Sequence, residues 1–230
     1  MLGNYRALSL AYEDIIMKLV RIWDVPTRLF HWLLVLAIIG LWYTGTKGDM
    51  DRHLPLAYFT LTLLLFRFIW GFVGGFYSRF SALQLAPINA IRYLRSGLKS
   101  DYPGHNPLGS WSVVGLFFCV AVQLITGLFA NDSILFEGPL AHYISGGLSN
   151  QITSWHSLNF NILLGLVALH ISAVLFYTVV KRDDILPAMI TGKRSVSEGV
   201  NEPDRQHPAR SLIVMAVAAG VVWLISRLGY

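Results

Sequence analysis

Two histidines in one long apolar stretch are the residues of this sequence best suited to bind a metal centre. His156 and His170 lie 14 residues apart in the run 154–180. Fourteen helical steps fall about 40° short of four full turns, so both imidazoles would lie on nearly the same side of a helix. The rise of about 1.5 Å per residue separates them by about 21 Å, a large part of a bilayer's hydrocarbon thickness. Because ionisable groups at membrane depth usually face the interior of a bundle, this spacing suggests two stacked metal centres.

The composition places these histidines in an integral membrane protein. Of the 230 residues, 54% are hydrophobic and only 13% are charged, whereas soluble domains carry about 25% charged residues. Five apolar segments approach or exceed the length of a membrane span, and a helix is the structure that satisfies its own backbone in hydrocarbon. We therefore predict an all-α membrane protein with a four-helix transmembrane bundle and a fifth, C-terminal transmembrane helix. The predicted spans are residues 29–44, 54–72, 109–130, 154–180 and 211–228.

The basic residues predict an orientation. With the N-terminus in the cytoplasm, the inner segments hold 14 Lys and Arg residues and the outer segments hold 3, and the outer loop 131–153 holds none. This bias follows the positive-inside rule and places the C-terminus on the outer side. The formal net charge of +5 is then explained by inner loops that meet anionic lipid, and it does not indicate nucleic-acid binding.

This orientation sorts four histidines into two pairs by depth. His53 and His156 fall at the outer level and are called the outer pair; His31 and His170 fall at the inner level and are called the inner pair. Two imidazoles on facing helices suit a six-coordinate haem of the b type, which favours electron transfer. A c-type haem and iron–sulfur clusters are excluded because Cys119 is the single cysteine. A proton relay, an ion path and structural polar contacts are the alternatives.

Further predictions concern the segments that flank the predicted spans. Asp24 and Pro26 are expected to begin the first helix, and residues 88–98 to form an interfacial helix. Residues 183–210 are expected to form a polar cytoplasmic linker. The first residues lack the pattern of a secretory signal, and translation could begin at Met1 or at Met17. Interfacial anchoring is predicted for Trp23, Trp32, Trp42, Trp111, Trp155 and Trp223.

Four stretches carry a family resemblance. Residues 23–32 read Trp-Asp-Val-Pro-Thr-Arg-Leu-Phe-His-Trp. Further similar stretches lie from His53 through 66–71, at 104–109 with 126–132, and at His156 and 170–174. Over residues 18–194 the chain resembles the bacterial di-haem cytochrome b family, which includes bacterial cytochrome b561 and the b-type subunits of nickel–iron hydrogenases. One position departs from the pattern: Ala57, four residues after His53, stands where relatives generally have glycine.

The resemblance implies a site and a domain plan. His31, His53, His156 and His170 would bind two haem b groups within a four-helix domain at 25–182. Residues 1–24 would precede this domain, and the linker 183–210 would lead to the last helix at 211–230. Arg67 is the one formal charge inside a span and is expected to pair with a haem propionate or to reach the inner headgroups. Arg28 is a similar candidate or a positive-inside anchor. The loop residues His105 and His142 are interpreted as a turn residue and a solvated residue.

The predicted function is electron transfer across the bacterial inner membrane. Electrons would pass between the quinone pool and a periplasmic redox protein, such as a cytochrome c or a hydrogenase, with a quinone pocket near the inner pair. One alternative is a superoxide:quinone oxidoreductase, for which Lys47 and Arg52 beside His53 would attract the anion. A second alternative is a haem-free proton or ion transporter. The donor, the acceptor and any oligomeric assembly are left open by the sequence.

Overall fold

The structure is a computed structural model that describes residues 18–98, 102–196 and 208–229. The two predicted translation starts, Met1 and Met17, therefore lie outside the described residues. Within them, five helices are long and apolar enough to cross a membrane, which confirms the predicted all-α membrane fold. They are α2 (Val25–Lys47), α3 (Met50–Val73), α5 (Pro107–Leu128), α6 (Gly146–Leu175) and α8 (Pro208–Ser226). A single π-helical turn, Phe176–Val180, continues α6.

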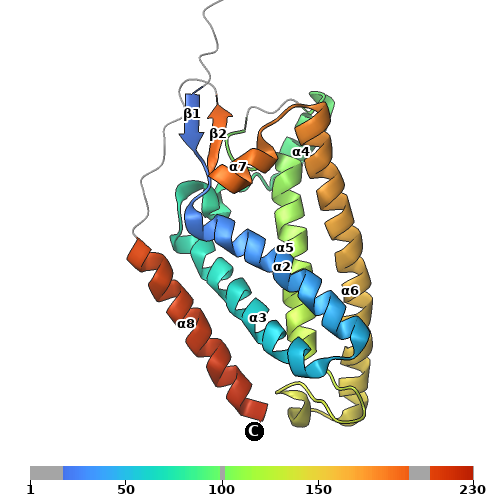
Figure 1. Ribbon diagram of the computed structural model, residues 1–230. Coiled ribbons are helices and arrows are strands. Elements are labelled where there is room, and N and C mark those ends of the chain that lie inside the picture. Colours follow the sequence, from blue (N-terminus) through green and yellow to red (C-terminus); the bar gives the residue numbers. More distant parts are fainter. Residues whose placement is uncertain (1–17, 99–101, 197–207, 230) are drawn as a thin grey trace, which may run out of the picture.

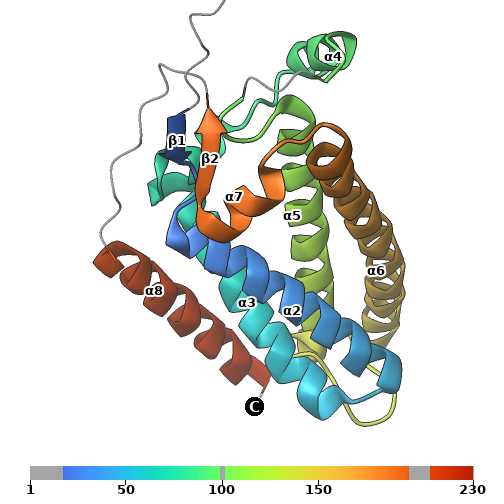
Figure 2. The ribbon, with the colours of Figure 1, turned by 45° about the horizontal axis from the view of Figure 1, so that its top comes forward.

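The spans form two antiparallel hairpins and one additional helix. α2 pairs with α3, α5 pairs with α6, and the two hairpins meet through α3 and α5. α8 packs along α3 on the side away from α6 (Figures 1 and 2). The α2–α3 turn and the α5–α6 loop lie at one end of the bundle, and the short elements lie at the other (Figure 1).

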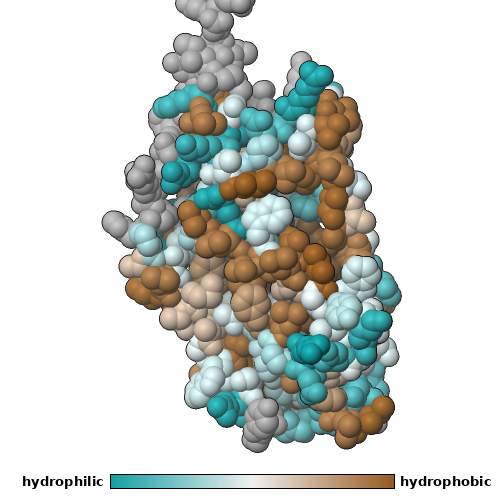
Figure 3. Space-filling model, in the orientation of Figure 1, coloured by the Kyte–Doolittle hydropathy of each residue, from teal (hydrophilic) through white to brown (hydrophobic). Residues whose placement is uncertain are grey.

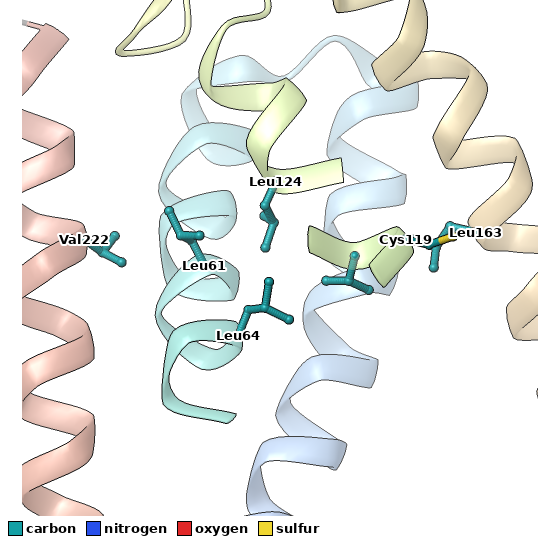
Figure 4. Packing of buried hydrophobic residues seen from close by; sticks show 7 residues of the cluster. Leu61, Leu64, Cys119, Leu124, Leu163 and Val222 are labelled. Carbon is teal, nitrogen blue, oxygen red and sulfur yellow. The ribbon is translucent and has the colours of Figure 1, made fainter. Parts of the chain in front are cut away.

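The apolar core lies where α3 and α5 meet. Leu61 and Leu64 of α3 point toward Leu124 of α5, and Val222 of α8 approaches them from the other side (Figure 4). Cys119 is a free thiol buried in the same cluster. Because lipid is as apolar as leucine, close van der Waals packing is what stabilises these contacts in a membrane.

A polar contact adds to the packing of α5 against α6. The buried Asn159 amide of α6 donates to the Cys119 carbonyl at 2.9 Å and to the Gln123 side chain at 2.7 Å. Hydrogen bonds between helices stabilise their association in membranes, where an unpaired amide has no water to bind. This contact fixes the rotation of α6, and therefore the direction in which its histidines point.

Short elements form a cap over one end of the bundle. The cap comprises β1 (Lys18–Arg21), α4 (Pro87–Arg95), residues 102–106, α7 (Ile185–Thr191) and β2 (Lys193–Val196), and β1 pairs antiparallel with β2. The sequence analysis did not predict α7 or the two strands. Each strand has only four residues, and they meet across more than 170 positions of sequence, so no local pattern reveals the pairing. The segment predicted as a linker thus contains two folded elements.

Arg194 of β2 joins the parts of the cap. Its guanidinium binds both carboxylate oxygens of Asp183, at 2.6 and 2.8 Å, and donates to the carbonyls of Tyr102, Pro103 and Gly104. The side chain is buried, and bidentate pairing with a carboxylate is the geometry that guanidinium favours. The loop before α5 is thereby fixed to the end of α6.

A buried tyrosine cluster also joins the cap to the bundle. The Tyr93 hydroxyl of α4 donates to the Tyr177 hydroxyl at 3.1 Å and accepts from the Asn106 amide at 3.1 Å. Burial raises the pKa of Tyr93, so this phenol stays protonated and keeps its donor. The interfacial helix predicted at 88–98 is present but ends at Arg95, because Gly97 adopts a φ of 74°.

Two helices begin four or more residues earlier than predicted. α3 begins at Met50 instead of residue 54, and α6 begins at Gly146 instead of residue 154. Their first turns are polar, so the apolar pattern that defines a span does not include them. The Asp49 and Ser145 side chains cap these turns by accepting from backbone N–H groups.

The surface is apolar over the spans. Figure 3 shows a broad apolar belt between polar residues at the two ends of the bundle, as expected for a surface that faces lipid. Most of the tryptophans predicted as interfacial anchors are exposed. Trp23 is the exception: it is buried in the cap and lies against the His105 ring, so its predicted anchoring role is wrong.

Asp24 connects the start of α2 to the end of α3. As predicted, it caps α2 by accepting from the Thr27 backbone N–H at 2.8 Å. Its second oxygen accepts from the Trp70 indole at 3.1 Å, the Ser78 hydroxyl at 2.8 Å and the Gly75 backbone N–H at 3.2 Å. One carboxylate therefore fixes the depth at which α2 enters the bundle.

Asp24→Ala is expected to lower the free energy of unfolding by roughly 3 kcal/mol, because hydrogen bonds to a charged acceptor are lost and buried donors stay unpaired. Unfolding in mixed detergent micelles, followed by circular dichroism, measures the change. Asp49→Ala is the matched control: it removes an exposed helix cap and should cost less than about 1 kcal/mol. Equal losses in the two variants would show that the Asp24 network does not stabilise the fold.

Candidate metal centres

The outer pair lies at the end of the bundle that contains the α2–α3 turn. His53 is in the first turn of α3, and His156 lies on α6, close enough for the two imidazoles to interact electrostatically. Both side chains are partly buried. The structure therefore brings together two histidines that are 103 positions apart in sequence.

Each outer imidazole hydrogen-bonds a threonine of the preceding helix. His53 Nδ1 lies 3.1 Å from the Thr44 hydroxyl, and His156 Nδ1 lies 3.1 Å from the Thr126 hydroxyl. Both hydroxyls give their own proton to a backbone carbonyl one turn earlier, at 2.8 Å for Thr44 and 2.7 Å for Thr126. The threonine oxygen can then accept from Nδ1–H, and each ring also meets a backbone carbonyl, that of Leu41 for His53 and that of Gln123 for His156. The tautomer with Nδ1–H leaves the Nε2 lone pair of each ring free to bind a metal.

A glycine follows each of these threonines and lies against the same ring. A Cβ at Gly45 would lie 3.3 Å from His53 Cε1, and a Cβ at Gly127 would lie 3.2 Å from His156 Cε1. Both distances are tighter than ordinary contacts, so a side chain here would require the imidazole to shift by a few tenths of an ångström. The dipeptide Thr-Gly thus occurs twice with one role: threonine sets the tautomer and glycine makes room for the ring.

The inner pair lies toward the cap. His31 on α2 and His170 on α6 interact electrostatically with each other, and both are partly buried. The Trp32 ring packs edge-on against the His31 ring, with 5.0 Å between centroids. Among the described residues, His31 Nδ1 is a buried atom with no hydrogen-bond partner. The inner pair therefore differs from the outer pair in how its rings are held.

Arg67 and His105 lie beside the inner pair. The buried Arg67 side chain packs over the Phe80 ring at 5.2 Å, and within the described residues its Nη1 has no partner. His105, in the loop before α5, interacts electrostatically with Arg67, His170 and His31. Burial, followed by the charge of Arg67, lowers the pKa of His105 to about 3, and Arg194 acts in the same direction, so the His105 ring is neutral at pH 7.

Arg28 contacts a different part of the structure. Its Nη1 donates to the Ile190 carbonyl of α7, and Nε is buried without a partner among the described residues. With Val25, Leu29, Trp32 and Ile190 it lines a recess at the surface. Arg28 therefore connects α2 to the cap, whereas Arg67 interacts electrostatically with His105 beside the inner pair.

These donors fit two bis-imidazole haem groups. Two histidine pairs lie at the two ends of the bundle, and the outer rings present free Nε2 atoms. The buried Arg67 Nη1 without a partner suits a propionate, since Arg pairs readily with carboxylates. The α2 and α6 backbones, which carry three of the four histidines, share no extensive contact, as expected if a flat group lies between them.

Thr44, Gly45 and His105 were missed as site residues by the sequence analysis. The repeated Thr-Gly at 44–45 and 126–127 is the signal that could have identified the first two, because each dipeptide precedes a candidate ligand on the next helix. No comparable signal existed for His105. Its Asn-Pro neighbours favour a turn, and only the tertiary contacts bring the ring near the inner pair.

Gly127→Ala is expected to displace the His156 ring and to reduce haem retention at the outer pair at least severalfold, with the inner pair unaffected. Gly45→Ala should do the same through His53. The haem-to-protein ratio after purification measures the loss. Gly165→Ala is the matched control, since a Cβ there meets nothing within 4 Å and full retention is expected. Full retention in all three variants would contradict a tight fit around the rings.

Comparison with known proteins assigns the chain to a family. Residues 22–192 match the family described as prokaryotic cytochrome b561. The chain is 27% identical over 214 residues to the probable Ni/Fe-hydrogenase 1 B-type cytochrome subunit of Escherichia coli K12, covering 76% of this chain and 90% of that protein. It is 26% identical over 223 residues to the corresponding subunit of Azotobacter chroococcum, covering 80% and 91%. No solved structure matches the chain. The chain belongs to the prokaryotic cytochrome b561 family and is a membrane b-type cytochrome.

Proposed function

We propose that this cytochrome carries electrons across the bacterial inner membrane through two haem b groups. The outer haem would be held by His53 and His156, and the inner haem by His31 and His170, with Arg67 binding an inner propionate. Bound haem supplies one-electron exchange, and two axial imidazoles leave no open coordination site for a substrate. The observation that carries this proposal is the presence of two histidine pairs at opposite ends of one bundle.

The proposed electron route connects the quinone pool with a periplasmic redox protein. The positive-inside bias puts the cap in the cytoplasm and the outer pair near the periplasm. The names of the relatives link their proteins to Ni/Fe-hydrogenases, which makes a hydrogenase the first candidate partner and a cytochrome c the second. The haem-free transporter is not favoured, since membership of a cytochrome family implies haem.

Paired histidine variants test the assignment. His53→Ala with His156→Ala should retain one haem per chain, as should His31→Ala with His170→Ala. The crossed variant, His31→Ala with His53→Ala, should retain none, because each centre then lacks one axial ligand. Haem content by the pyridine haemochrome method, with total iron, measures the result. One haem retained in the crossed variant would contradict the pairing.

A quinone site is proposed at the recess near the inner pair. Val25, Leu29, Trp32 and Ile190 give it an apolar wall that opens at the surface of α2, and Arg28 contributes a polar group at its edge. Apolar walls with few polar groups are typical of small-molecule sites. Trp32 lies between this recess and His31, which would place a quinone ring close to the inner centre.

Leu29→Trp should fill the recess and raise the apparent KM for a short-chain quinone several-fold, with both haem potentials unchanged. Leu36→Trp is the control, because residue 36 lies two turns further along the same exposed face of α2 and outside the recess. Quinone-dependent oxidation of the reduced protein provides the rates. An unchanged KM in Leu29→Trp would exclude the recess as the quinone site.

Superoxide oxidation is the second candidate function. Lys47 and Arg52 are the basic residues near His53, but Arg52 already pairs with Asp49 at 3.2 Å, which weakens the attraction available to an anion. Superoxide-driven haem reduction in the purified protein, without a partner, would support this activity. The absence of any reduction would reject it.

A further inference from the structure

The outer pair and the inner pair of histidines differ in the hydrogen-bond partners of their Nδ1 atoms. Both outer rings donate Nδ1–H to a threonine oxygen at 3.1 Å, whereas His31 Nδ1 in the inner pair has no partner among the described residues. The threonine oxygens are fixed acceptors, since each hydroxyl proton is held by a carbonyl of its own helix. The difference in Nδ1 hydrogen bonding between the two pairs therefore arises from groups that the helix backbone holds in place, and not from freely rotating side chains.

A hydrogen bond at Nδ1–H changes the imidazole as a ligand. It draws the proton away from the ring and makes Nε2 more basic, which stabilises the ferric state over the ferrous state. Outer hydrogen bonds of this kind are among the means by which proteins tune haem potentials. On the proposed function, on which this inference rests, both axial ligands of the outer haem carry this effect.

Charge acts in the opposite direction at the inner pair. Arg67 is a buried cation with an unpaired Nη1, and it interacts electrostatically with His105, as His31 and His170 do. The Asp24 carboxylate interacts with the same guanidinium and offsets part of its charge. A nearby positive charge disfavours the more positive ferric state, and the effect is large where water is excluded. The same charge neutralises a propionate if it binds one.

From these two observations we infer that Thr44 and Thr126 are positioning residues that hold the outer haem at a lower midpoint potential than the inner haem. With haem held at both pairs, transfer of one electron from the outer centre to the inner centre would be downhill, the outer centre losing the electron that the inner centre gains. The electron originates in the periplasmic partner and leaves to a quinone. This order of midpoint potentials favours electron transfer toward the quinone.

The first test measures the two centres separately, each in a variant that keeps the wild-type histidines of one centre only. Redox titration of the His31→Ala, His170→Ala protein gives the outer potential, and titration of the His53→Ala, His156→Ala protein gives the inner potential. The outer value should be the lower one. Equal or reversed values would overturn the inference, whereas loss of both haems in either protein would instead refute the proposed pairing.

The threonines are then tested in the full protein. Thr44→Ala and Thr126→Ala should each raise the outer potential and lower the ferric-to-ferrous ratio at a fixed potential by roughly three- to tenfold, which is about 59 mV at the upper end for a one-electron couple. The inner potential should not change. Thr→Ser at each position should restore the wild-type value, because serine keeps the oxygen.

Thr62→Ala is the matched control. The Thr62 hydroxyl on α3 donates to the Tyr58 carbonyl at 2.9 Å. Thr62→Ala therefore removes the same kind of hydrogen bond to the helix backbone, but it removes no hydrogen bond to a histidine. Neither potential should move in this variant. If the Ala variants lose the outer haem, Thr→Val and Thr→Ser variants are titrated instead. Valine keeps the side-chain volume of threonine, and serine keeps its oxygen. An outer potential that is the same with valine and with serine would overturn the inference.

Discussion

A buried imidazole between apolar helices needs an acceptor for its N–H, because the hydrocarbon around a membrane bundle provides none. At the outer pair this requirement is met by Thr44 and Thr126. The consequences extend through the site. The threonine bond selects the tautomer, the tautomer frees Nε2, and the adjacent glycines leave room for the ring in that orientation. The two hairpins therefore act as two equivalent supports, each of which presents one ligand to the space between them.

The other end of the bundle uses a folded cap. Arg194 fixes the loop before α5 to the end of α6, and Asp24 fixes the start of α2 to the end of α3. These contacts hold His31, His105 and Arg67 in one region without a direct bond to the His31 ring. The inner centre is thus shaped by buried charge and packing, whereas the outer centre is shaped by hydrogen bonds. Such different environments are what the proposed one-way electron transfer between two centres would require.

Much of this arrangement was predictable from periodicity and charge. Apolar runs predicted five spans, and the 14-residue spacing predicted two levels on α6, because both depend on local helix geometry. The Asp24 cap was predictable for the same reason. The β1–β2 pairing, the buried position of Trp23 and the role of His105 were not, since each depends on contacts between distant segments. The repeated Thr-Gly dipeptide was a sequence signal for Thr44, but its meaning followed only from the contact of the hydroxyl with His53.

The central claim is that four histidines bind two haem groups two by two. Quantitative electron paramagnetic resonance of the oxidised wild-type protein, together with iron content, tests it most directly. The account predicts two low-spin, six-coordinate ferric haems per chain and no high-spin signal, because every axial position is taken by an imidazole. A single haem per chain, or a stoichiometric high-spin signal from an open axial position, would contradict it.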